Sequence, residues 1–114
     1  MVSNGQLQYQ NLFDATVDAL YAALEKIGGN NIAIVVSESG WPSDGGVGTT
    51  TKNDQTYVSN LIRHVGQGTP KLPGNYIDTF IFSMFDENMK QPQGIENHFG
   101  LFNPDKQPKY SLSF

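Results

Sequence analysis

The sequence predicts an α/β fold built on a parallel sheet. Two segments with helical periodicity, residues 13–27 and 53–65, alternate with two apolar segments, residues 31–38 and 77–85. Both apolar segments are rich in β-branched or aromatic residues, as strands buried on both faces are. Helices that alternate with such strands are typical of a parallel sheet. No linker interrupts the alternation, so residues 1–114 are expected to form a single piece.

The first helix is predicted between residues 13 and 27. Its apolar residues recur at the helical period and form one face: Phe13, Val17, Leu20, Tyr21, Leu24 and Ile27. Asn11 is the expected N-cap, and Asp14 suits the positive end of the helix dipole. Gly28, directly after the last apolar position, is a stop signal. Residues 1–10 are polar and contain glycine, and they are expected to be loop.

The first strand is predicted at residues 31–38, where an apolar run ends in one carboxylate. Because side chains alternate along a strand, Glu38 shares a face with Ile32, Ile34 and Val36. Removing a carboxylate from water costs free energy, and such carboxylates cluster at functional sites. The alternative is that Glu38 emerges into solvent at the end of the strand and pairs with a lysine.

The second helix, residues 53–65, is expected to bury four side chains: Tyr57, Leu61, Ile62 and Val65. Before it, the Gly- and Thr-rich residues 44–51 form either part of a substrate site or a connector. The second strand, residues 77–85, also ends in acids, Asp86 and Glu87. Carboxyl ends of parallel strands meet at one edge of a sheet, so two strands that end in carboxylates indicate a site there.

Residues 88–107 are expected to be mostly loop, and the tail, residues 107–114, a short closing helix with Pro108 near its first turn. Phe80, Phe82 and Phe102 are expected in the core. His64 and His98 have no partners at metal-ligand spacing, so neither a metal nor an organic cofactor is expected.

Composition excludes several classes of function. Seven Lys and Arg against eleven Asp and Glu give a net charge of −4, which disfavours nucleic-acid binding because phosphates require clustered cations. The chain has no cysteine, so no disulfide or thiolate metal site is expected. No apolar run approaches the roughly 20 residues that span a bilayer, and the start of the chain lacks the pattern of a signal peptide.

One stretch carries a resemblance to a known family. The aliphatic run and the residues after it, Ser37-Glu38-Ser39-Gly40-Trp41-Pro42-Ser43, resemble the signature of the plant endo-β-1,3-glucanases of glycoside hydrolase family 17. The similarity extends over essentially the whole chain, including Met84-Phe85-Asp86-Glu87-Asn88 and residues 98–105.

The resemblance implies part of a TIM (β/α)8 barrel, from about its sixth helix to its closing helix, with two parallel buried strands. The chain has 114 residues, less than half of the roughly 250 in a complete barrel. It would therefore be the carboxyl-terminal third of the enzyme, and a missing amino-terminal part would explain the absent signal peptide.

Site residues follow from the same resemblance. Glu38 matches the catalytic nucleophile. Three residues match charged groups of the family's cleft: Glu87, Lys90 and Glu96. Three others match aromatic positions near the cleft: Trp41, Phe85 and Phe99. The general acid of related barrels lies on an earlier strand. The resemblance also implies a β-1,3-glucan substrate, roles in carbohydrate metabolism and plant defence, and a secreted or vacuolar parent protein.

A retaining glycosidase needs two carboxyl groups about 5 Å apart, one to attack and one to protonate the leaving sugar. Glu38 fits the first role, and Glu96, with Glu87 behind it, is the candidate acid within this chain. If Lys90 reaches Glu38, it favours the charged nucleophile. Alternatively, Lys90 bridges Glu87 and Glu96 and only balances their charge.

Three further hypotheses stay open at this point. The chain could be a non-catalytic glucan-binding fragment, which would bind without forming product. It could belong to an enzyme that cuts mixed β-1,3/1,4-glucans, since the signature would be shared. It could also be an unstable barrel fragment with no function alone. Two strands leave open sheet edges, so self-association is expected.

Overall fold

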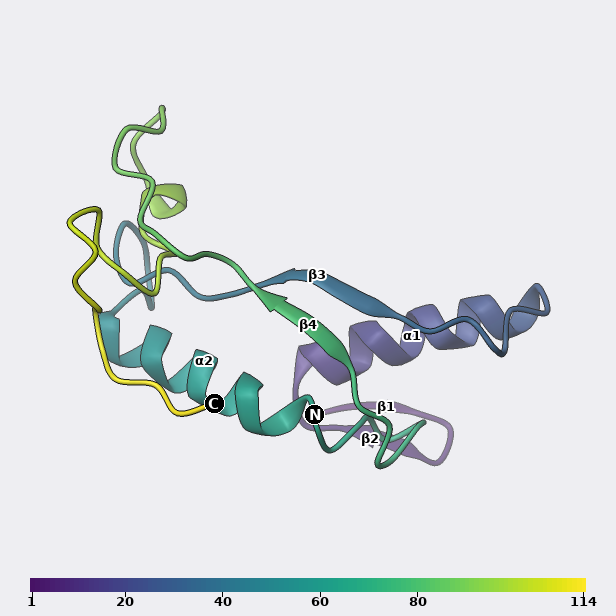
Figure 1. The fold of residues 1–114 in the computed structure, drawn as a ribbon. Coiled ribbons are helices and arrows are strands. Elements are labelled where there is room, and N and C mark those ends of the chain that lie inside the picture. Colours follow the sequence, from purple (N-terminus) through teal and green to yellow (C-terminus); the bar gives the residue numbers. More distant parts are fainter. The chain divides into compact units, whose positions relative to one another are not determined.

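The computed structural model describes residues 1–114, except for the side chain of Val2. Its elements follow the order β1 (Val2–Asn4), β2 (Leu7–Tyr9), α1 (Leu12–Lys26), β3 (Val35–Ser39), α2 (Thr51–His64), β4 (Asp78–Ile81) and the 3₁₀ helix η1 (Ile95–Asn97) (Figure 1). The chain divides into two compact units: Met1–Val35 with Val65–Asp78, and Val36–His64 with Thr79–Phe114. None of the described helices is long and apolar enough to cross a membrane.

The first unit begins with a hairpin that the sequence did not indicate. Strands β1 and β2 pair antiparallel, with Asn4 opposite Leu7. The two residues between them form the turn, and Gly5 has a φ of +62°. Glycine suits the first central position of a two-residue hairpin turn because that position requires a positive φ. The prediction that residues 1–10 are loop is therefore wrong.

Helix α1 has the predicted start and stop signals, although each end lies one residue earlier than expected. The backbone N–H of Asp14 donates to the Asn11 side chain at 2.8 Å, which confirms the N-cap. At the other end, the N–H of Gly29 donates to the carbonyl of Leu24 at 2.8 Å, and Gly28 has a φ of +81°. Glycine adopts this left-handed conformation without steric cost and so terminates the helix.

The apolar face of α1 is only partly buried. Val17 and Tyr21 are buried, whereas Leu20 is exposed and Ile27 is 80% exposed. The prediction is wrong for these two residues. Ile27 is the C-cap, where the backbone has left helical geometry. The first unit instead buries Asp18, whose Oδ2 accepts a hydrogen bond from the backbone N–H of Lys71 at 2.9 Å.

Strands β3 and β4 pair as two parallel strands, which confirms the predicted sheet. Both are shorter than predicted, and the second turns away after Ile81. The expected burial on both faces is wrong, because no residue of β3 or β4 is buried. Val35 and, just before β3, Ile32 are exposed, and Phe80 is 64% exposed. No described residue covers these side chains, so the apolar pattern marks surfaces that this chain alone leaves open.

Helix α2 begins two residues earlier than predicted because Thr50 acts as a cap. Its Oγ1 accepts a hydrogen bond from the backbone N–H of Asn53 at 3.1 Å. Leu61 is buried as expected, but the most deeply buried apolar residue of α2 is Val58, which the sequence had not indicated.

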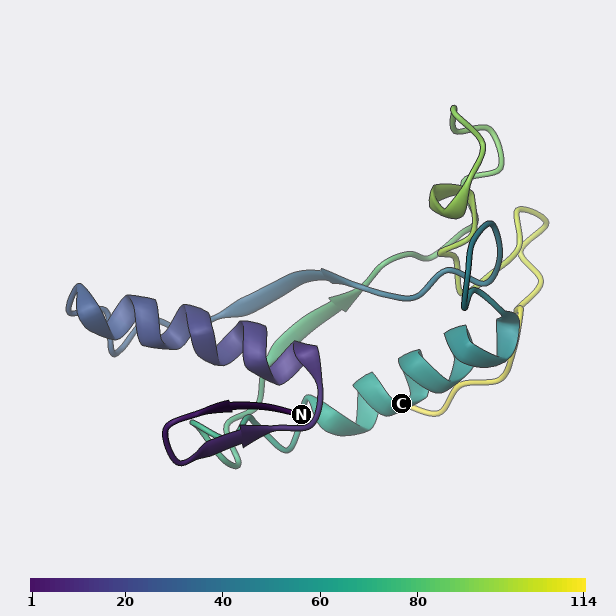
Figure 2. The ribbon, with the colours of Figure 1, turned by 180° about the vertical axis from the view of Figure 1, so that it is seen from behind.

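The tail of the chain lies along α2 in both ribbon views (Figures 1 and 2). It is not the predicted closing helix: η1 is the last helical segment of the described residues. Pro108 forms an antiparallel bridge with Phe102, and the N–H of Lys109 donates to the carbonyl of Leu101 at 3.0 Å. Backbone groups used in this way cannot form a helical turn.

Candidate active site

Glu38 is the penultimate residue of β3 and is exposed at the carboxyl end of the strand. The next residue is anchored, because the Ser39 hydroxyl and the Tyr57 hydroxyl of α2 are 2.7 Å apart. A Cβ on Gly40 would lie 1.9 Å from the carbonyl oxygen of Phe82, so only glycine allows this close approach. The backbone that directly follows Glu38 is therefore held in place, while the carboxylate itself stays accessible.

Trp41 lies two residues past the strand, as a partly exposed platform. Its Nε1 donates to the carbonyl of Gly48 at 3.1 Å, and its ring centroid lies 5.7 Å from that of Tyr57. The hydrogen bond fixes the indole, which nevertheless remains 37% exposed. A fixed, accessible aromatic ring is suited to stacking on the apolar face of a sugar.

Glu87, Lys90 and Glu96 come together as one cluster. The Lys90 ammonium lies 3.1 Å from Glu87 Oε2 and 3.1 Å from Glu96 Oε2. Hydrogen bonds to Glu96 and then to Glu87 raise the pKa of Lys90 above its usual value. Among the described residues these are the carboxylates that pair with Lys90, so it bridges the two glutamates and forms no ion pair with Glu38.

The aromatic residues predicted at the site pack in two pairs. The rings of Phe85 and Phe102 are 5.9 Å apart, and those of Phe82 and Phe99 are 5.5 Å apart. Phe85 stays 39% exposed. Phe82, Phe99 and Phe102 are partly buried, whereas the expectation that Phe80 belongs to the core is wrong.

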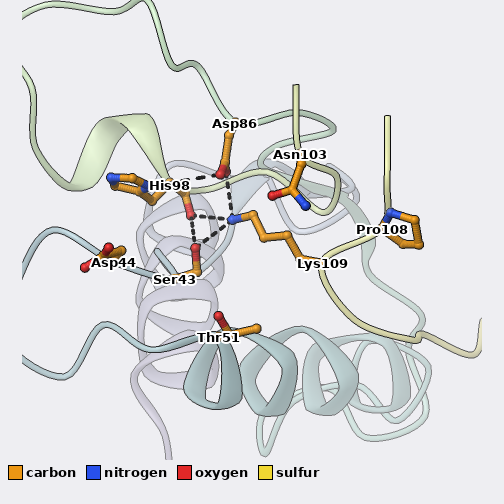
Figure 3. A pocket seen from close by; sticks show the side chains of 8 residues that line it. All are labelled: Ser43, Asp44, Thr51, Asp86, His98, Asn103, Pro108 and Lys109. Atoms are coloured by element: carbon orange, nitrogen blue, oxygen red, sulfur yellow. Dashed lines mark hydrogen bonds and ion pairs between the residues drawn. The ribbon is translucent and has the colours of Figure 1, made fainter. Parts of the chain in front are cut away.

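Asp86, directly before Glu87, forms a mostly buried ion pair with Lys109 that the sequence had not indicated; the Lys109 and Asp86 side chains are 6% and 12% exposed. Lys109 Nζ lies 2.7 Å from Asp86 Oδ1 and donates to Ser43 Oγ at 2.7 Å and to the carbonyl of His98 at 3.0 Å (Figure 3). Asp86 also accepts from the backbone N–H of Gly100 at 2.8 Å. These bonds fix the residue that directly precedes Glu87.

Asp54 of α2 extends this network. It is completely buried and accepts a hydrogen bond from the Tyr110 hydroxyl at 2.6 Å. Burial raises the pKa of Asp54 to about 6, although the Tyr110 hydrogen bond and the charge of Lys109 both act in the opposite direction. The sequence contained a signal for this burial, because Asp54 lies four residues before Val58 and seven before Leu61, on the buried stripe.

This pKa predicts a pH-dependent stability. Between about pH 4 and pH 6 the folded chain holds the Asp54 proton and the unfolded chain has released it. The free energy of unfolding therefore falls as the pH rises through this window, by about 1–3 kcal/mol, and levels off above it. Urea unfolding at a series of pH values should show that Asp54→Asn removes this part of the slope. A slope equal to that of wild type would contradict the assignment, and the exposed Asp78→Asn serves as the control.

One open pocket of about 300 Å³ lies beside the network (Figure 3). Its lining is mostly polar: Ser43, Asp44, Thr51, Asp86, His98, Asn103, Pro108 and Lys109. Most of the polar atoms of Lys109 and Asp86 already bind each other or the backbone. Within the described residues, no group of three or more His, Cys, Asp or Glu side chains could hold a metal ion.

Residues 1–114 match the sequence pattern of glycosyl hydrolases family 17. The chain belongs to this family. The resemblance that the sequence carried is thereby confirmed, and the α/β elements form part of the family's barrel.

Several similar proteins come from plants. The chain is 59% identical over its full length to a glucan endo-1,3-beta-glucosidase of Vitis vinifera and covers 33% of it. It is 58% identical over its full length to the basic vacuolar isoform GLB of Nicotiana tabacum and covers 30% of that protein. One similar solved structure is a plant beta-glucan endohydrolase, one of two with distinct substrate specificities. It superposes with a TM-score of 0.93 at 52% sequence identity. The match covers 100% of this chain and 37% of the endohydrolase. The chain thus spans about a third of the length of these family members.

Proposed function

We propose that this chain supplies the nucleophile of an endo-β-1,3-glucanase that retains the anomeric configuration. The observation that carries the proposal is the accessible carboxylate of Glu38 at the carboxyl end of β3, in a chain of family 17. In the first step, a Glu38 oxygen attacks the anomeric carbon, the glycosidic bond breaks, and a covalent glycosyl-enzyme forms while an acid protonates the leaving sugar. Water then releases the glycosyl group and restores the carboxylate.

The acid is expected to come from a part of the barrel outside this chain. An acid must carry a proton that it can give to the leaving oxygen. Glu96 and Glu87 instead accept hydrogen bonds from the same ammonium, at 3.1 Å each. This arrangement favours a role in substrate binding for both glutamates. Glu96 remains the candidate acid within the chain if the isolated chain proves active.

The proposed substrate is a β-1,3-glucan, bound with the help of exposed aromatic rings. Trp41 and Phe85 keep part of their rings accessible, whereas Phe99 packs edge-on against Phe82. A secreted or vacuolar location and a role in plant defence are proposed for the parent protein, in keeping with the vacuolar isoform among its relatives. Mixed β-1,3/1,4-glucans are the alternative substrate, because the similar solved endohydrolases differ in specificity.

The test uses a hybrid enzyme, in which this chain replaces the matching third of the Vitis vinifera relative. We expect the hybrid to release reducing sugars from a soluble β-1,3-glucan and none from a β-1,4-glucan. The isolated chain is expected to bind the β-1,3-glucan without forming product. A folded hybrid without activity would contradict the proposal, and release by the isolated chain that disappears in Glu96→Gln would assign the acid role to Glu96.

We also propose that the isolated chain self-associates. Phe80 is 64% exposed, and Met84 and Val35 are exposed as well. Exposed apolar side chains beside unpaired strand edges favour association. Sedimentation velocity should show a mass that increases with concentration, and Phe80→Lys should reduce the increase. A chain that stays monomeric at all concentrations would exclude this.

A further inference from the structure

Asn97 is unusual among the polar side chains of its loop because it is buried. It is 1% exposed, whereas Glu87, Lys90 and Glu96 around it are all exposed. A buried amide is costly unless its polar atoms are hydrogen-bonded.

Three hydrogen bonds satisfy the Asn97 amide. Its Nδ2 donates to the backbone carbonyls of Glu87 at 2.8 Å and of Lys90 at 2.9 Å. Its Oδ1 accepts from the backbone N–H of Gly94 at 2.7 Å. Two carbonyls can only accept and an N–H can only donate, so the network sets the orientation of the amide.

These bonds join two segments that carry the charged cluster. Glu87 and Lys90 lie at the two ends of one turn, closed by a 3.0 Å hydrogen bond from the N–H of Lys90 to the carbonyl of Glu87. Glu96 lies on η1, next to Asn97 itself. The amide therefore holds the turn against η1, and this placement lets the Lys90 ammonium lie 3.1 Å from both carboxylates.

We infer that Asn97 is a positioning residue, which holds Glu87, Lys90 and Glu96 in one cluster at the glucan site. The identity of the ligand, a β-1,3-glucan, rests on the proposed function, whereas the positioning role of Asn97 does not. The ion pairs themselves are exposed and weak, so they do not hold the two segments together. Three part-buried hydrogen bonds, whose loss would leave the Lys90 carbonyl and the Gly94 N–H unpaired, provide the stronger restraint.

The test is an NMR titration of the Lys90 ammonium in the 114-residue chain and its variants. Wild type should show a pKa above the usual value of about 10.4 for lysine. In Asn97→Ala the value should fall toward 10.4, since the carboxylates are no longer held beside the ammonium. Asn88→Ala, which removes an exposed amide of the same loop, should leave the titration of Lys90 unchanged.

Asn97→Leu keeps nearly the volume of the side chain and adds no charge. It can neither donate to the carbonyls of Glu87 and Lys90 nor accept from the backbone N–H of Gly94. We expect it also to lower the pKa of Lys90, and it provides the answer if Asn97→Ala does not fold. An unchanged Lys90 titration in either folded variant would overturn the inference.

The glucan readout is independent of this titration. Wild type should show saturable shifts of the Glu87 and Glu96 backbone signals with a soluble β-1,3-linked glucotriose, and Asn97→Ala should bind it at least about five-fold more weakly. No binding by wild type would count against the proposed function, whereas the Lys90 titration would still decide the role of Asn97. Equal affinity in wild type and Asn97→Ala would restrict that role to the ion pairs and overturn its link to the glucan site.

Discussion

Glu38→Gln is expected to lower kcat of the hybrid enzyme on β-1,3-glucan by at least about 10³-fold. Glutamine keeps the size of the side chain but cannot form the glycosyl-enzyme as a carboxylate does. Because Glu38 is exposed and Ser39 and Gly40 hold the backbone, the variant should keep the stability of wild type. Reducing-sugar release and urea unfolding measure the two quantities. Glu25→Gln, on α1 and outside the site, is the control and should retain full activity.

Chemical rescue distinguishes a nucleophile from an acid at this position. In Glu38→Ala the lost carboxylate leaves space, and azide can attack an activated aryl β-glucoside from the same side as Glu38 would. The expected product is an α-glycosyl azide, with the aryl alcohol as leaving group. A β-glycosyl azide would mean that another group acts as nucleophile, and would make Glu38 the acid.

Lys109→Met is expected to lower the free energy of unfolding by about 3–5 kcal/mol. The Lys109 side chain is only 6% exposed, and its loss removes the ammonium that lies 2.7 Å from the Asp86 carboxylate. Asp54, whose Oδ2 lies 3.9 Å from Lys109 Nζ, loses the same positive charge. Removing one partner of a buried pair costs more than removing both, because a single charge stays uncompensated.

Urea unfolding followed by Trp41 fluorescence measures this effect in the second unit. Lys52→Met, on the exposed face of α2, should cost less than about 0.5 kcal/mol and is the matched control. The double variant Lys109→Met/Asp86→Asn should recover part of the lost stability. If Lys109→Met were as stable as Lys52→Met, the buried pair would not support the segment that carries Glu87.

The family and the main elements could be predicted from the sequence, because they depend on local patterns. The spacing of Val17 and Tyr21 predicted α1, and Asn11 and Gly28 predicted its ends, since caps and helical periods involve residues close in the chain. The apolar run that ends at Glu38 predicted β3. The carboxylate itself is exposed, which the sequence offered only as the alternative to a desolvated one. That residues 1–114 form a single piece, and that Glu38 is the nucleophile, stay predictions.

Only the tertiary structure decided which polar groups support the site. Asp86 and Lys109 are 23 residues apart, Asp54 and Tyr110 are 56 apart, and no local period relates either pair. Lys90 pairs with Glu87 and Glu96 and not with Glu38. The buried amide of Asn97 joins the turn that carries Glu87 and Lys90 to η1, which carries Glu96. The tail is irregular and not helical, because Pro108 forms a bridge with Phe102. Local patterns determine elements and their ends, whereas the pairing of buried charges and amides depends on contacts between segments distant in sequence.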